Sequence, residues 1–206
     1  MKKAMTIGEL LVTMSIIGII AALVLPGFLK DYHNKLYVAH LKKVYEMLDS
    51  AVNQACSDNN VSYFYQTPYS LYSENGANQQ AFIDKYFKKS TRAVASPFSQ
   101  TYKLIGVSNT LPVNLANSHG LGKLVGGEAV SFYCNGAETY CLMRVDINST
   151  DGPNIAGRDF FALFVDKRTN KIYDHAPATN CGIAVASLAI TGCFGRIMQD
   201  NWEMKY

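Results

Sequence analysis

LLVTMSIIGIIAALVL, residues 10–25, is the stretch that decides how this chain is organised, because its only polar members are Thr13 and Ser15. Extended back to Met5 it covers 21 residues. As an α-helix these residues span about 31 Å at about 1.5 Å per residue, and the hydrocarbon core of a bilayer is about 30 Å thick. The run therefore predicts a membrane-spanning helix.

The residues on either side of the run indicate its orientation. Lys2 and Lys3 precede it with no acidic residue beside them, so the positive-inside tendency predicts a cytoplasmic N-terminus and an extracytoplasmic main body. A secretory signal peptide has the same basic start, but it ends in a small-residue cleavage site after a shorter apolar core. Here the run ends in the residues PGF at 26–28, which favours an anchor.

The composition restricts the class of protein. Of the 206 residues, 49% are hydrophobic and only 17% are charged, which excludes intrinsic disorder. The single long apolar run excludes a multi-pass membrane protein. From Lys30 onward the chain has 17 Lys and Arg against 15 Asp and Glu. This balance does not indicate a nucleic-acid partner.

Glu9 is the anomaly within the apolar stretch. An acidic residue costs about 2.5–3.5 kcal/mol near the centre of a membrane helix and less near an end, and such a residue is by default a functional one with a partner. The alternative is a side chain that reaches out to the headgroup level.

The N-terminus resembles that of type IV prepilins and type II secretion pseudopilins, through the string KAMTIGEL at residues 3–10, the apolar helix and Pro26. The resemblance implies that residues 1–4 form a leader, which a prepilin peptidase removes by cutting between Ala4 and Met5. The peptidase then methylates the new N-terminus. Glu9 matches the glutamate of the family, and Pro26 matches its helix-bending proline.

The same resemblance implies a structural role and not catalysis. Such subunits are held in the inner membrane with the head in the periplasm, and they assemble through their N-terminal helices into a filament. The implied partners are further copies, other pilins or pseudopilins, the prepilin peptidase and an inner-membrane assembly platform. Glu9 then pairs with the Met5 amine of a neighbouring subunit, and an ion pair is far stronger in hydrocarbon than in water.

Gly18 and Pro26 both lower the stability of the helix. The resemblance suggests that this stretch unfolds when the subunit passes from the bilayer into the filament. The alternative is that Gly18 is an ordinary transmembrane glycine.

The remainder of the chain predicts an α+β head. Apolar residues at spacings of three and four indicate one helical face that continues to about Cys56: Leu41, Val44, Leu48, Val52 and Ala55. Strands are expected at residues 101–107, 140–147, 160–165 and 171–173, a short helix at 81–89, and a mobile Gly- and Asn-rich loop at 108–127. The expected fold is pilin-like. A long N-terminal helix, transmembrane over residues 5–29 and amphipathic over 30–56, packs on a small antiparallel sheet in a head of residues 30–206.

Five cysteines follow the apolar run, and an exported chain meets an oxidising compartment, so disulfides are expected. The connectivity does not follow from the sequence alone. We expect Cys134–Cys141 across the short polar turn NGAETY and Cys181–Cys193 in the C-terminal region. Cys56 is then left over as a small buried hydrophobic residue.

Oxygen-bearing side chains gather around a glycine turn in residues 146–159. Calcium takes six to eight oxygen ligands on a bent loop, and the segment is similar in place and composition to a calcium loop of some major pseudopilins. The alternative is a polar turn whose side chains cap their own backbone. The candidate ligands are Asp146, Asn148, Asp151, Asn154 and Asp159, and we expect no other cofactor.

Residues 57–80 are rich in Ser, Asn, Gln and Tyr and predict a surface loop. Its tyrosines either bind aromatic groups or sugar, or pack the loop on the head. The chain carries no G-x-S-x-G, H-E-x-x-H, C-x-x-C, P-loop or G-x-G-x-x-G motif, so we expect no enzyme. The alternative function is a single-pass, membrane-anchored extracytoplasmic binding module that does not polymerise, which predicts an uncut Met1 and a dispensable Glu9.

Overall fold

The structure, a computed structural model, describes residues 6–90, 96–105, 107–113, 115, 119–181 and 191–206. The chain divides into two compact units, Met1–Leu36 and Tyr37–Tyr206, and we call the second unit the head. A single α-helix, α1 (Ile7–Asp58), passes without interruption from one unit into the other and contains Pro26.

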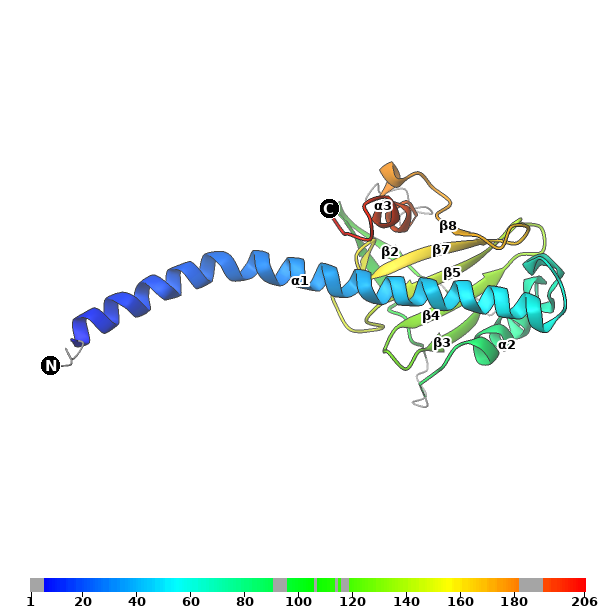
Figure 1. Cartoon of the computed structure of the whole chain (residues 1–206), viewed down its shortest axis with the longest axis horizontal. Helices are drawn as coiled ribbons and strands as arrows, with labels where there is room; N and C mark the ends of the chain where they lie inside the picture. Colours follow the sequence, from blue (N-terminus) through cyan, green and yellow to red (C-terminus); the bar gives the residue numbers. More distant parts are fainter. Residues whose placement is uncertain (1–5, 91–95, 106, 114, 116–118, 182–190) are drawn as a thin grey trace. The chain divides into compact units, whose positions relative to one another are not determined.

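Two further α-helices and a sheet form the described part of the head (Figure 1). The helices are α2 (Ala77–Tyr86) and α3 (Cys193–Gln199), with 3-10 turns η1 (Phe64–Gln66), η2 (Pro68–Ser70) and η3 (Ala178–Asn180). The strands are β1 (Thr101–Leu104), β2 (Val107–Pro112), β3 (Gly120–Lys123), β4 (Ala129–Cys134), β5 (Tyr140–Asp146), β6 (Ile155–Ala156), β7 (Phe160–Asp166) and β8 (Ile172–Tyr173).

The eight strands form one mixed sheet in the order β2-β1-β6-β7-β5-β4-β3, and β8 pairs with β7 outside this path. Neighbouring strands are antiparallel except where β6 lies parallel to both β1 and β7. The predicted α+β class is therefore observed, but the sheet is not wholly antiparallel. The difference arises because the two-residue strand β6 lies between β1 and β7 in the sheet and pairs in parallel with both.

The head half of α1 packs on one face of this sheet, which it crosses in Figure 1. Its apolar face is the one expected from the helical spacing, since Leu41, Val44, Leu48 and Val52 are all fully buried. They share a core with residues of β4, β5 and β7. Side chains of a strand alternate between its two faces, so β7 contributes every second residue to this core: Phe161, Leu163 and Val165.

The opposite face of β7 carries a second, smaller core. Phe160 and Ala162 point into it, and the ring of Phe160 stacks on that of Tyr102 with 4.0 Å between centroids. Burial on both faces explains why the sequence FFALFV of β7 is apolar without alternation.

The loop expected at residues 108–127 contains most of β2 and all of β3. Gly120 of β3 lies against α2, and a Cβ atom there would come within 2.4 Å of the backbone of Gln79. Gly120 thus permits a close approach of strand and helix. Of the predicted loop, the turn between β3 and β4 is observed, and it contains Gly126 and Gly127.

Candidate functional site

Thr6 and Glu9 form a capping box at the start of α1. The Thr6 backbone N–H and the Thr6 hydroxyl both donate to Glu9 Oε2 at 2.9 Å, and the Glu9 backbone N–H donates to Thr6 Oγ1 at 3.2 Å. Such a reciprocal pair satisfies N–H groups that have no partner inside the helix. Thr6 was not predicted from the sequence, although T-x-x-E before an apolar run is the pattern that indicates a capping box.

Gly18 and Pro26 both lie inside the unbroken α1. Pro26 has no N–H and so cannot donate to the carbonyl group of the preceding turn. A Cβ atom on Gly18 would meet no heavy atom within 4 Å. The described structure therefore gives Gly18 no packing role. Ala4 and Met5, the predicted processing residues, lie outside the described residues.

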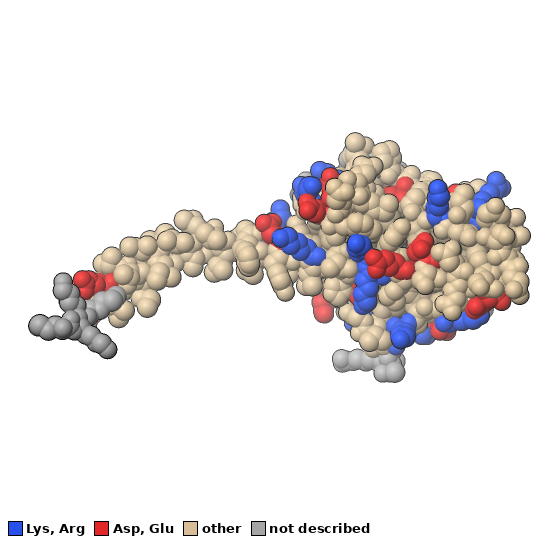
Figure 2. Space-filling view, viewed as in Figure 1, with Lys and Arg blue, Asp and Glu red and all other residues tan. Residues whose placement is uncertain are grey.

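The apolar side chains of α1 before Lys30 are exposed. The large hydrophobic residues from Ile7 to Leu29 are between 46% and 79% exposed, and their surface carries no charge after Glu9 (Figure 2). This helix is long and apolar enough to cross a membrane. Soluble monomers rarely leave so large a contiguous apolar surface in water, and a surface of this kind is typical of a segment that contacts a membrane or another protein.

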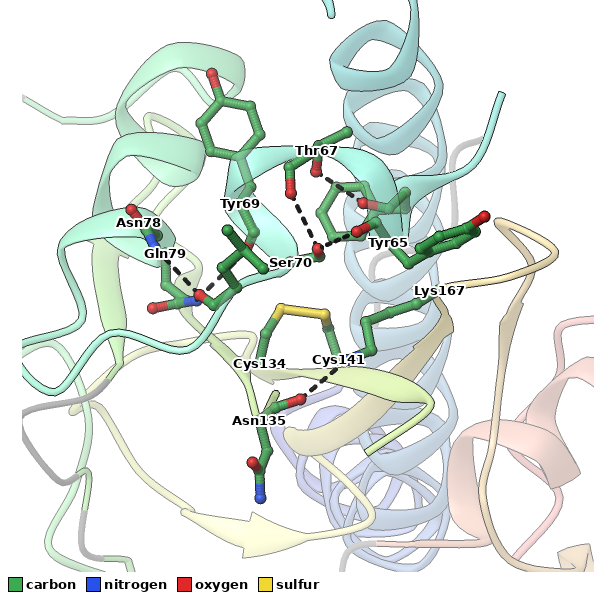
Figure 3. Close-up of a disulfide and its surroundings, with 12 residues drawn as sticks. Tyr65, Thr67, Tyr69, Ser70, Asn78, Gln79, Cys134, Asn135, Cys141 and Lys167 are labelled. Carbon is green, nitrogen blue, oxygen red and sulfur yellow. Dashed lines mark hydrogen bonds between the residues drawn. A yellow bond between two sulfur atoms is a disulfide. The ribbon is translucent and has the colours of Figure 1, made fainter. Parts of the chain in front are cut away.

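The two disulfides of the head are Cys134–Cys141 and Cys181–Cys193, the pairings expected from the sequence. Cys134 and Cys141 lie directly opposite each other on the antiparallel strands β4 and β5. Their bridge closes the turn between these strands (Figure 3). Cys56 is a free, buried thiol, and burial raises its pKa, while a hydrogen bond from Asn170 opposes this effect.

The candidate calcium loop uses its side chains on its own backbone. Asp159 accepts hydrogen bonds from the backbone N–H groups of Asn154 and Ile155, and the Asn148 amide donates to the carbonyl groups of Asp151 and Gly152 at 2.6 and 2.7 Å. These contacts are those of a polar turn.

The carboxylates of this loop do not converge on one point. Asp146 accepts a hydrogen bond from the Tyr102 hydroxyl, and burial raises the pKa of Asp146 to about 7. Asp151 is exposed. No group of three or more Asp, Glu, His or Cys side chains is placed to hold a metal ion within the described part of the chain. The side-chain oxygens of Asn148 and Asn154 are buried and have no hydrogen-bond partner among the described residues. The calcium site therefore stays a prediction, and we derive nothing from it.

Glu128 is a buried carboxylate that joins α1 to the sheet, and it was not predicted from the sequence. Its Oε1 atom lies 2.7 Å from Nδ1 of His40 and 3.1 Å from Nζ of Lys43, and its side chain is fully buried. Burial alone would raise its pKa, but the hydrogen bonds from His40 and Lys43 lower the pKa overall.

We expect Glu128→Gln to lower the free energy of unfolding at pH 7 by about 1.5–3 kcal/mol, the usual worth of a hydrogen bond to a charged group. Because the folded-state pKa lies below the unfolded value of about 4.3, the stabilisation is complete above that value. It is lost as the pH falls through the folded-state pKa. Urea unfolding at several pH values measures this difference.

The matched control is Glu46→Gln, which changes an exposed glutamate on α1. It should alter the free energy of unfolding by less than about 0.5 kcal/mol. Equal effects of the two substitutions at pH 7 would contradict the role given to Glu128.

Comparison with protein-family models, with curated proteins and with solved structures finds no match to this chain. The class that the geometry defines is therefore an α+β protein with a long apolar N-terminal helix and a disulfide-bonded head.

Proposed function

We propose that this chain is a structural subunit of a type IV pilus-like or type II secretion pseudopilus filament. In this proposal a prepilin peptidase cuts between Ala4 and Met5 and methylates the amine of Met5. Before assembly the subunit is anchored in the inner membrane with its head in the periplasm, and it then enters the filament through α1.

The observation that carries the proposal is a capped glutamate in the first turn of α1, whose exposed apolar stretch up to Leu29 has no other charge. In a transmembrane anchor that carboxylate serves only the helix cap. A filament subunit needs it, because cleavage before Met5 creates a cationic amine that would enter the apolar filament core without a partner. An uncompensated charge in such a core is costly.

The capping box supports this role for Glu9. Both bonds from Thr6 end on the Oε2 atom of Glu9, and within the described residues no hydrogen bond to Oε1 is present. One carboxylate oxygen is thus held by the subunit's own helix start. The other is left for the amine of a neighbouring subunit.

The competing function is a single-pass, membrane-anchored binding module that does not polymerise. It shares the same anchor and the same head, so it differs from the filament subunit only in what happens at the N-terminus. It requires no cleavage and no partner for Glu9.

Intact-mass and N-terminal peptide spectrometry of the protein from its native membrane separate the two functions. We expect a chain that starts at N-methylated Met5, because the peptidase of such systems cuts and methylates there. A chain that still starts at Met1 would leave Glu9 without its amine partner. That result would replace the filament subunit with the anchored binding module.

A further inference from the structure

A pocket of about 590 Å³ opens on the head between the loop that follows α1 and the turns that end β4 and β7. We call it the tyrosine pocket. Its lining includes Tyr63, Tyr65, Leu71, Glu138, Lys167 and Arg168. The volume lies in the range of about 300–1,000 Å³ that is typical of small-molecule sites. None of its residues takes part in the proposed assembly.

Backbone hydrogen bonds join the three segments of the tyrosine pocket. The Tyr65 N–H donates to the Lys167 carbonyl, and the Lys167 N–H donates to the Thr139 carbonyl, both at 2.9 Å. The Ser70 hydroxyl donates to the Tyr65 carbonyl at 2.8 Å, and the disulfide Cys134–Cys141 closes the turn opposite (Figure 3). The pocket is therefore preorganised, which reduces the ordering that a ligand must impose on it.

Two tyrosine rings form one wall of the pocket. Tyr63 and Tyr65 stack with 6.0 Å between centroids and 17° between planes, and they are 45% and 49% exposed. Phe64 between them is fully buried in the core, so the chain is anchored at the point from which both tyrosines project. Tyrosine rings offer an apolar face together with a hydroxyl group, which suits a ligand with both kinds of surface.

Lys167 places a buried ammonium group at the tyrosine pocket. The residue is 6% exposed, and its Nζ donates to the Asn135 carbonyl at 2.9 Å. Across the described residues no carboxylate lies within ion-pair distance of it. Burial lowers its pKa, and the charge of Glu138 opposes this effect. An ammonium group has three N–H donors, so this one has donors left for oxygen atoms of a ligand.

We propose that the tyrosine pocket binds a sugar ring of a glycan. The ring packs its C–H face on the tyrosine wall, while Lys167 donates to its hydroxyl oxygens and Glu138 accepts from its hydroxyl groups. The carboxylate of Glu138 favours hydroxyl groups over phosphates. The near balance of charge from Lys30 onward, 17 Lys and Arg against 15 Asp and Glu, also argues against a nucleic acid.

The test uses the full chain in amine-oxide detergent micelles, because maltoside and glucoside detergents would compete for the pocket. The probes are maltotriose, cellotriose, triacetylchitotriose and trigalacturonate, each titrated calorimetrically to about 10 mM. We expect at least one of them to bind with a dissociation constant of about 1 mM or tighter. Tyr65→Ala should weaken that binding at least tenfold. Tyr65→Phe, which keeps the ring, should weaken it less than threefold.

Tyr32→Ala is the matched control, since Tyr32 is an exposed tyrosine of the other compact unit, and it should leave binding unchanged. Tyr63→Ala is the second variant if Tyr65→Ala does not fold, as judged by the fluorescence of Trp202. Absence of binding to all four probes would overturn the proposal. So would binding that both tyrosine variants leave intact, or binding of an eight-residue thymidine oligonucleotide in place of the sugars.

Discussion

Filament assembly is expected to fail when Glu9 is replaced with Gln, although the head stays folded. Gln has nearly the same size and can still accept the hydrogen bonds from Thr6, so the substitution removes the charge and preserves the cap. Leaving a buried charge without its partner costs about 3–5 kcal/mol. For each subunit contact this corresponds to a loss of about two to four orders of magnitude in the association constant.

The measurement is the amount of sheared filament from cells that produce the variant, compared with the amount of subunit in their membranes. Thr6→Val is the matched control, because it removes the hydroxyl of the capping box and keeps the charge. Loss of a helix cap costs about 0.5–2 kcal/mol, so this variant should assemble at a reduced level. Normal assembly of Glu9→Gln would contradict the ion pair. Equal failure of both variants would show that Glu9 acts through the cap.

Replacing Leu48 with Ala is expected to lower the free energy of unfolding of the head by about 2–5 kcal/mol, the range for buried leucines. Leu48 is fully buried in the core that joins α1 to the sheet. The residues of α1 before Leu36 belong to the other compact unit and add helical signal of their own, so circular dichroism is a poor probe of this change. Trp202 is the single tryptophan, and its ring lies 5.3 Å from that of Tyr45 on α1. Its fluorescence therefore reports whether the helix and the head remain packed.

Leu71→Ala is the control for this experiment, because Leu71 is 57% exposed. It should change the free energy of unfolding by less than about 0.5 kcal/mol. A loss below about 1 kcal/mol for Leu48→Ala would mean that the head half of α1 contributes little to the core, contrary to the burial described here.

Features that depend on residues close in sequence could be predicted well. The apolar run and the three- and four-residue spacing of Leu41, Val44, Leu48 and Val52 predicted α1 and its buried face. The two disulfides join cysteines only 7 and 12 residues apart, and both were expected from the polar turn and the C-terminal position of these cysteines. The Thr6–Glu9 capping box was equally local, and it was missed because Glu9 was considered only as a charge.

Features that depend on distant residues could not be predicted in this way. Gly120 looks like a loop residue until its close approach to Gln79 is known. The hydrogen-bond donors of Asp146 and Asp159 could not be predicted either, among them Tyr102, which is 44 residues away from Asp146. Strand β6 has only two residues, and its parallel pairing with β1 and β7 has no signature in its own sequence.

The sequence by itself determined the long helix, its apolar and uncharged first half, the position of Glu9 and the fold class, because helical periodicity and hydrophobicity act over a few neighbouring residues. Only the tertiary structure decided the mixed sheet, the burial of Glu128 beside His40 and Lys43, and the tyrosine pocket with its buried Lys167. A buried polar group must find a partner wherever the fold places one, and for Glu128 and Lys167 that partner lies far along the chain.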